Sequence, residues 1–199
     1  MMKTNPGNFF EDFRLGQTIR HATPRTVTAG DVALYTALYG PRFAVQSSDA
    51  FARAIGFAAA PVDDLLTFHI VFGKTVPDVS LNAVANLGYA ECRFLRPVFP
   101  GDTLSTVSEV IGLKENSSAK TGTVYVRSVG SNQRGEDVLS YVRWVMVKKA
   151  RLDAPAPEAV VPALAPAVAS DALVVPEGLD FSRYDFALAG ERHRWGDYA

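Results

Sequence analysis

The chain has 199 residues, of which 48% are hydrophobic and 21% charged, as is ordinary for a globular protein. This length allows one large domain, or a domain of about 150 residues with an extension. The net charge of -1 provides no drive toward nucleic acid or anionic membranes, and no apolar stretch approaches the roughly 20 residues that span a bilayer. The single cysteine, Cys92, excludes an intrachain disulfide and is typical of a reducing compartment. Because the N-terminus also lacks the apolar core of a secretory signal, we expect a cytoplasmic protein.

A strand and two capped helices are predicted in the first third of the chain. The run Gln17–Val27 alternates between apolar and polar residues, which predicts a β-strand. Thr28 and Asp31 then have the spacing of a capping box. We expect the helix after Thr28 to end before Pro41, because proline cannot continue the hydrogen-bond ladder. Ser48 is the expected N-cap of a second, short helix.

The segment from Asp63 to Phe72 predicts a buried helix. It opens with the carboxylates Asp63 and Asp64, which suit the positive end of a helix dipole. It then becomes apolar on almost every side, and a helix that is apolar all round is usually buried. This pattern fits an ordinary core helix of any α+β fold as well as a helix that a sheet wraps. We interpret His69, in its middle, as a hydrogen-bonded core histidine.

Four strand-like runs follow without an intervening helix, and turn-forming residues separate them. They are Val84–Val98, Thr103–Leu113, Thr121–Ser131 and Val138–Lys149. Between the first two, Pro100 presets φ and Gly101 tolerates positive φ, which predicts a type II turn that joins two antiparallel strands in a hairpin. One strand, then helices, then four antiparallel strands is the order of an α+β fold.

The composition changes sharply near residue 151. Residues 153–176 are mostly Ala, Pro and Val, which indicates a semi-extended linker. The segment beyond is rich in aromatic residues, so it is either the start of a second, related half or a tail that folds back over the sheet. We therefore expect a domain at 1–150, a linker at 151–177 and a C-terminal extension at 178–199.

Residues 94–104 read Phe-Leu-Arg-Pro-Val-Phe-Pro-Gly-Asp-Thr-Leu, and with the residues before them they resemble the MaoC-like (R-specific enoyl-CoA hydratase) branch of the hotdog fold. The residues that frame the family's catalytic segment also match, with Tyr39-Gly40 before it and Asp49-Ala50-Phe51-Ala52 after it. The resemblance covers residues 8–150. It implies an α+β hotdog fold, in which an antiparallel sheet wraps around a long buried helix, as one repeat of a double hotdog.

The resemblance places Pro41 at the family's catalytic aspartate and Gln46 at its catalytic histidine. Neither can exchange a proton near neutral pH, whereas hydration of an enoyl thioester needs groups that activate water and manage the α-carbon proton. In the family a His-Gly pair opens the buried helix, whose N–H groups stabilise an oxyanion. Asp63 and Asp64 stand there in this chain. The catalytic residues are thus unknown, and the expected substrate-binding residues are Arg42, Gln46, Asp63 and Asp64; Arg42 could bind a carboxylate or phosphate bidentately.

The resemblance implies reversible addition of water to an enoyl-CoA, with mesaconyl-CoA and β-methylmalyl-CoA as the expected substrate pair and a repeat that lacks the catalytic Asp and His. One alternative is a non-catalytic half that dimerises or binds acyl-CoA. Another is a hotdog thioesterase that uses Asp63 or Asp64. No cofactor is implied beyond the CoA of the substrate. Because an isolated repeat leaves a sheet edge uncovered, we expect a homodimer or pairing with a second repeat. The spacing of the histidines and the cysteine predicts no metal site.

Overall fold

The computed structural model describes residues 5–40 and 43–189, which form two compact units. The unit that contains the β-sheet comprises residues 5–25, 68–96 and 103–174 and is called the sheet unit. The unit that contains the shorter helices comprises residues 26–40, 43–67, 97–102 and 175–189 and is called the helical unit. Each unit is described by itself below.

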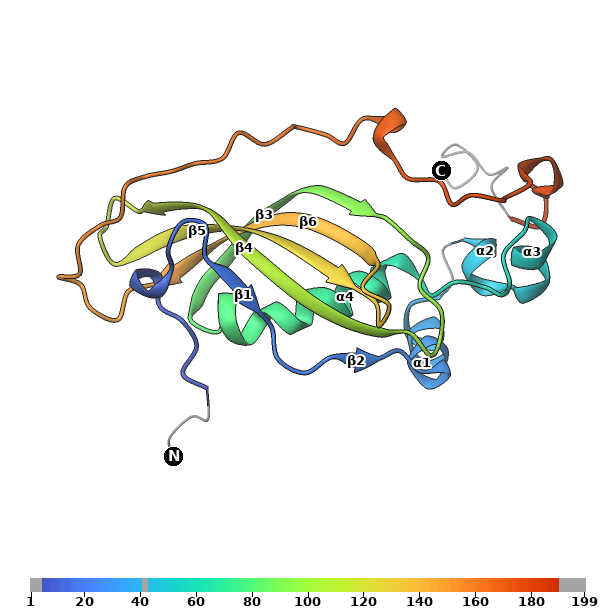
Figure 1. Ribbon diagram of the computed structural model, residues 1–199, viewed down its shortest axis with the longest axis horizontal. Coiled ribbons are helices and arrows are strands. Elements are labelled where there is room, and N and C mark those ends of the chain that lie inside the picture. Colours follow the sequence, from blue (N-terminus) through green and yellow to red (C-terminus); the bar gives the residue numbers. More distant parts are fainter. Residues whose placement is uncertain (1–4, 41–42, 190–199) are drawn as a thin grey trace, which may run out of the picture. The chain divides into compact units, whose positions relative to one another are not determined.

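The sheet unit is built on long antiparallel strands in the spatial order β1-β4-β5-β6-β3 (Figure 1). The strands are β1 (Thr18–Arg20), β3 (Ala83–Phe94), β4 (Thr103–Glu115), β5 (Thr121–Ser131) and β6 (Asp137–Lys148). The four predicted C-terminal strands are therefore confirmed, with shifts of a few residues at their ends. The predicted strand Gln17–Val27 is instead two short strands, β1 and β2 (Arg25–Thr26). It breaks because Thr23 has a φ of 61° and Pro24 has no N–H for a strand ladder.

The turn at Phe99–Asp102 has the predicted geometry but does not close a hairpin. Gly101 has a φ of 101°, and the N–H of Asp102 donates to the Phe99 carbonyl at 3.0 Å. However, β3 pairs with β6 and β4 pairs with β5, so the predicted hairpin is wrong. The turn instead exchanges backbone hydrogen bonds of 2.7 and 2.8 Å with Val27. Local turn residues fix a reversal of the chain, whereas the partner of a strand depends on which faces are buried.

Helix α4 (Asp64–Thr75) continues into a π-helical turn (Val76–Ser80). Within the sheet unit Val71 packs against β5 at Gly130, where a Cβ atom would lie 2.5 Å from Cγ2 of Val71. Thr106 of β4 donates a hydrogen bond to the Val71 carbonyl at 3.2 Å. Only part of the helix is buried by this chain, however: His69 is exposed and Phe72 is half-buried. The interpretation of His69 as a core histidine is therefore wrong, because residues 68–75 bury one face and leave His69 on the other.

The main core of the sheet unit lies at the end of the sheet near β1. Its members are apolar side chains from three strands, the N-terminal segment and the π-helical turn: Phe10, Phe13, Val79, Val110, Leu113, Val124, Val126, Val145 and Val147. A short 3₁₀ helix (Phe10–Asp12) positions Phe10, whose ring occupies the space beside Gly122. The alternation of strand residues explains this core, because every second side chain of β5 and β6 points to the same face.

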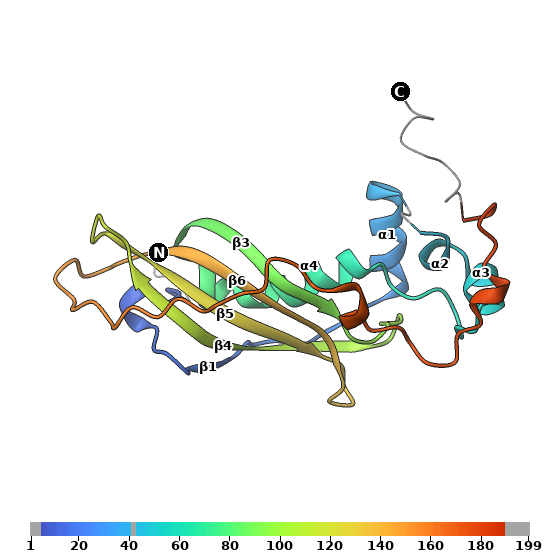
Figure 2. The same ribbon diagram turned by 90° about the horizontal axis from the view of Figure 1, so that it is seen from above.

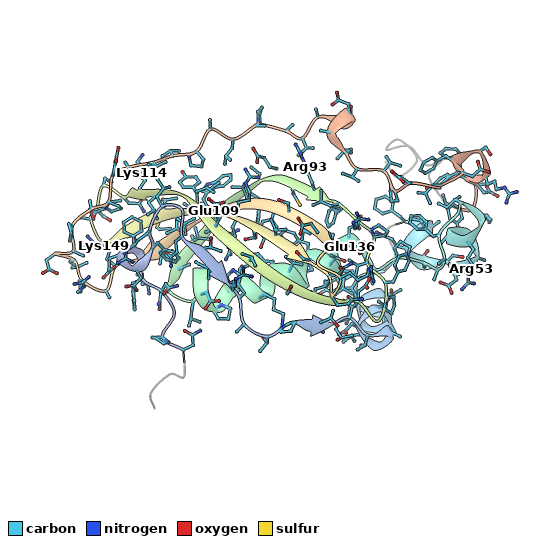
Figure 3. The ribbon with its side chains drawn as sticks, viewed as in Figure 1. Arg53, Arg93, Glu109, Lys114, Glu136 and Lys149 are labelled. Carbon is cyan, nitrogen blue, oxygen red and sulfur yellow. The ribbon has the colours of Figure 1, made fainter. Side chains whose placement is uncertain are left out.

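The alanine- and proline-rich segment is anchored to the sheet unit at both its start and its middle. Lys149, at the end of β6 (Figure 3), is buried and donates to the Ala154 carbonyl at 2.8 Å and to Glu115 at 2.7 Å. Further along, Val160 forms an antiparallel bridge with Leu113 of β4. The segment can be followed in Figure 2 along the sheet. It is extended, as predicted, and a short 3₁₀ helix (Ser170–Ala172) follows near its end.

The helical unit contains α1 (Ala29–Tyr39), α2 (Ala44–Ser47), α3 (Asp49–Ala54) and a 3₁₀ helix (Phe181–Arg183). Both predicted caps are confirmed: Thr28 and Asp31 form a capping box, and Ser48 caps α3. The C-terminal extension contacts α3 through the edge-on rings of Phe51 and Tyr184, whose centroids are 5.0 Å apart. None of the described helices is long and apolar enough to cross a membrane.

Candidate functional site

Gln46 and Asp64 meet in the helical unit. Gln46 belongs to the four-residue helix α2, and Asp64 is the first residue of α4. The side-chain amide of Gln46 lies near the Asp64 carboxylate and favours its charged form. The segment that leads into α4 is fixed by Val62, a buried residue, whose N–H donates to the Val98 carbonyl at 2.7 Å. The site thus joins two segments that are separate in the sequence.

Asp63 has a different role from its neighbour. Its Oδ1 accepts a hydrogen bond of 2.8 Å from the N–H of Leu65, and its carbonyl accepts from Thr67 at 3.0 Å. The carboxylate therefore caps the first turn of α4. Because the Leu65 N–H is already used by a carboxylate, it is not available to bind a developing oxyanion.

The carboxyl of Asp64 can exchange a proton near neutral pH. The pKa of its carboxyl is raised to about 6, mainly by burial and also by the negative charge of Asp63, while the nearby amide of Gln46 opposes both effects. A carboxyl with this pKa is partly protonated near pH 6, so it can donate a hydrogen bond as well as accept one. Perturbed carboxyls of this kind are frequent at functional sites.

The structure brings together three of the residues predicted for the site, namely Gln46, Asp63 and Asp64. Pro41 and Arg42, the other predicted positions, lie outside the described residues. Over residues 5–40 and 43–189, no three His, Cys, Asp or Glu side chains converge in a way that could hold a metal ion.

A buried polar chain in the sheet unit was not predicted from the sequence. Nδ1 of His21 contacts Oδ2 of Asp78 at 2.7 Å, and Nε2 contacts Oγ of Ser108 at 2.8 Å. Ser108 in turn contacts Oγ of Ser128, its partner across β4 and β5, at 2.7 Å. Burial lowers the pKa of His21, although Asp78 opposes this effect. His21 and Asp78 lie 57 positions apart, and no motif links them, so no sequence signal could have found the pair.

Ser108, His21 and Asp78 have the contacts of a hydrolytic triad, but a substrate cannot reach the serine. Ser108 is 0% exposed and His21 is 8% exposed. A nucleophilic serine must reach a carbonyl carbon, which a hydroxyl buried between strands and bonded to Ser128 cannot do. These hydrogen bonds therefore serve to satisfy buried polar groups inside the fold.

Arg143 is a buried cation beneath α4. Its Nη2 donates to the hydroxyls of Thr75 at 2.8 Å and Ser80 at 3.3 Å, and its guanidinium lies 4.6 Å from the centroid of the Phe72 ring. Its Nε and Nη1 are buried and have no hydrogen-bond partner among the described residues. The ring and the two hydroxyls partly replace the water that the guanidinium loses.

The comparisons with known proteins agree with this architecture. A family model described as MaoC like domain matches residues 11–132. The chain is 68% identical over 198 residues to mesaconyl-CoA hydratase of Cereibacter sphaeroides, and 64% identical over 196 residues to beta-methylmalyl-CoA dehydratase of Chloroflexus aurantiacus. These matches cover 100% and 98% of this chain but 58% and 56% of the relatives. The chain thus spans somewhat more than half the length of the curated relatives it matches.

Solved structures give the same result. A MaoC domain dehydratase from Chloroflexus aurantiacus superposes with a TM-score of 0.91 at 63% identity, over 100% of this chain and 57% of that one. A Mycobacterium tuberculosis protein with a double hotdog fold superposes with a TM-score of 0.69 at 25% identity, over 94% of this chain and 57% of that one. The predicted hotdog fold is therefore confirmed.

Proposed function

Because the chain belongs to the MaoC-like domain family, we propose that it is the first hotdog repeat of a hydratase that adds water reversibly to an enoyl-CoA. The oxygen of water bonds to the β-carbon and a proton is added to the α-carbon. The proposed substrate pair is mesaconyl-CoA and β-methylmalyl-CoA. The observation that carries this proposal is the 68% identity to a mesaconyl-CoA hydratase along the whole of this chain.

The site chemistry favours a role in substrate binding rather than in proton transfer. Hydration needs two ionisable groups that act on the water and on the α-carbon. Among the residues that meet at Gln46, Asp64 has a pKa raised to about 6, whereas the carboxylate of Asp63 caps the helix. We therefore assign proton transfer to a second repeat. Gln46 and Asp64 would hold the polar end of the acyl group, with Asp64 donating a hydrogen bond when it is protonated.

We also propose that a second hotdog repeat covers the exposed edge of the sheet unit. β3 is an edge strand, and its Val84, Leu87 and Tyr89 are exposed. The ring of Tyr89 packs against Phe68 and Phe72 of α4, at centroid distances of 5.6 and 6.1 Å. Edge strands with exposed apolar side chains normally pair or are covered. The chain alone would then form a homodimer. Separately, we propose that the protein is cytoplasmic, because its one cysteine fits a reducing compartment.

The test measures loss or gain of the enoyl-thioester absorbance with mesaconyl-CoA. The chain alone is compared with the chain co-expressed with the remaining C-terminal portion of the Cereibacter sphaeroides relative. We expect no steady turnover alone and clear turnover in the combination, where Gln46→Leu raises KM more than it lowers kcat. Steady turnover by the chain alone would contradict the division of labour. An inactive but folded combination would contradict the substrate assignment.

The raised pKa of Asp64 also favours a second candidate, a thioesterase in which this carboxylate activates water. That reaction releases free CoA thiol, which a thiol-reactive dye detects. Thiol release that disappears in Asp64→Asn would establish the thioesterase, whereas no release from several acyl-CoA substrates would retire it. A purely non-catalytic half that binds acyl-CoA is tested by calorimetry, and absence of affinity with and without the second portion removes it.

A further inference from the structure

A small cavity of about 200 Å³ lies in the sheet unit between the segment that connects β1 to β2 and the exposed side of α4. Its polar lining consists of Thr23, Arg25, His69 and Lys74, and Ile70 and Pro77 contribute apolar surface. No Asp or Glu stands among the described residues that line it. The volume is below the roughly 300–1,000 Å³ of pockets for drug-sized ligands, so it suits a small polar group.

Lys74 and Arg25 both line this cavity, and among the described residues no carboxylate lies beside Lys74. Nζ of Lys74 approaches Oγ1 of Thr23 at 3.5 Å. Burial lowers the pKa of the Lys74 ammonium, and the charge of Arg25 lowers it further, while no acidic group of the described chain raises it. An anion placed between Arg25 and Lys74 would reverse this unfavourable interaction, because it attracts both cations.

The backbone at the rim is held in an unusual conformation. Thr23 has a φ of 61°, in the left-handed region that residues other than glycine rarely adopt. Its hydroxyl donates to the carbonyl of Ala22 at 2.7 Å, which leaves the oxygen lone pairs directed to Lys74. Such strained conformations are concentrated at functional sites, among them ligand clamps. The strained residue thus coincides with the cluster of cations.

We propose that this cavity binds a phosphoryl group, either as a phosphate monoester or as a diphosphate. Arg25 supplies the planar guanidinium that bonds two phosphate oxygens, and Lys74 supplies a compact charge from the helix. His69 lines the same cavity and adds a ring N–H donor. The site stands apart from the hydration chemistry proposed above, since it needs only the anion.

The test is calorimetric titration of the whole chain with inorganic diphosphate at fixed ionic strength. Wild type binds saturably, and Lys74→Met and Arg25→Gln each weaken the affinity about tenfold or more, as expected for loss of a charge-assisted hydrogen bond. The matched control is Lys148→Met, which removes the same charge from an exposed strand end that does not line the cavity. Absence of saturable binding by folded wild type, or equal weakening in Lys148→Met, would overturn the proposal.

Two further titrations identify the source of the phosphoryl group. If Lys74→Met weakens CoA binding by the same factor as diphosphate binding and leaves pantetheine binding unchanged, the occupant is the phosphorylated end of CoA. If CoA binding is unchanged while diphosphate binding falls, the occupant is a free phosphate compound. Both results support the site. Failure of the proposed hydratase activity would appear only in the turnover assay, so the two proposals can fail separately.

Discussion

The carboxylate of Asp78 holds the imidazole of His21 at 2.7 Å, although the two lie 57 positions apart in the chain. The contact joins β1 to the π-helical turn that follows α4. Because Ser108 occupies the other ring nitrogen, the buried imidazole is bonded on both sides. The pair therefore fixes how the first strand and the end of the helix meet within the sheet unit.

This histidine makes stability depend on pH. Burial holds the pKa of His21 below its ordinary value of 6.5 in the folded state. The unfolded chain therefore binds the proton first, and the stability that the neutral ring contributes is present above about pH 6.5 and is lost as pH falls through the lower, folded pKa. In urea unfolding from pH 8 to pH 5, we expect His21→Gln to lack this part of the decrease. Equal pH dependence in both proteins would contradict the assignment.

Asp64 is expected to titrate with a midpoint near 6 by NMR of its carboxyl carbon. Two substitutions should move this pKa in opposite directions. Asp63→Asn lowers it, because a negative neighbour is removed, and Gln46→Leu raises it, because an amide that favours the charged carboxylate is removed. Shifts of the same sign would contradict the geometry of the site.

Asp64 also makes stability depend on pH, but in the opposite direction to His21. Its folded pKa is raised above the ordinary value of 3.8, so its stabilising contribution is complete below about pH 3.8 and is lost as pH rises through 6. At pH 8 we expect Asp64→Asn to be more stable than wild type by about 1–3 kcal/mol, with a smaller difference at pH 5. Chemical denaturation at the two pH values measures this difference. A constant difference would show that charge is not its cause.

Glycine substitutions test the contact between α4 and the sheet. Gly130→Ala would place a Cβ atom against Val71, so we expect a loss of about 1–3 kcal/mol in the free energy of unfolding. Val71→Ala in the same protein should recover part of it, as a double-mutant cycle would show. The control is Gly73→Ala on the open side of α4, where no atom lies within 4 Å of the new Cβ and helix propensity predicts a gain of about 0.5–1 kcal/mol.

The buried ammonium of Lys149 anchors the start of the alanine- and proline-rich segment. Lys149→Met removes its bonds to Glu115 and to the Ala154 carbonyl, and we expect a loss of about 2–4 kcal/mol in stability and faster proteolysis of residues 151–174. Lys148→Met, one residue away and exposed, should change stability by less than about 0.5 kcal/mol. Equal cleavage rates in the two variants would show that the anchor does not restrain the segment.

The local elements could be predicted because their signals are local. The capping box at Thr28, the N-cap at Ser48 and the alternation of the long strands each depend on residues a few positions apart. The fold class was predicted through the resemblance at residues 94–104. The partner of each strand was not, because pairing depends on long-range burial, and the turn at Pro100-Gly101 suggested a hairpin that does not form.

Most of the helices and strands, the hotdog family and the unusual residues Gln46, Asp63 and Asp64 at the family's catalytic positions could be recognised before any coordinates were known. The folded chain shows in addition that Gln46 lies near Asp64, that Asp63 caps the helix, and that the pKa of the Asp64 carboxyl is raised to about 6. It also shows that His21 meets Asp78 and that His69 is exposed. The physical reason is that a residue type fixes which interactions a side chain can make, whereas its burial and its partners depend on segments that are distant in the chain.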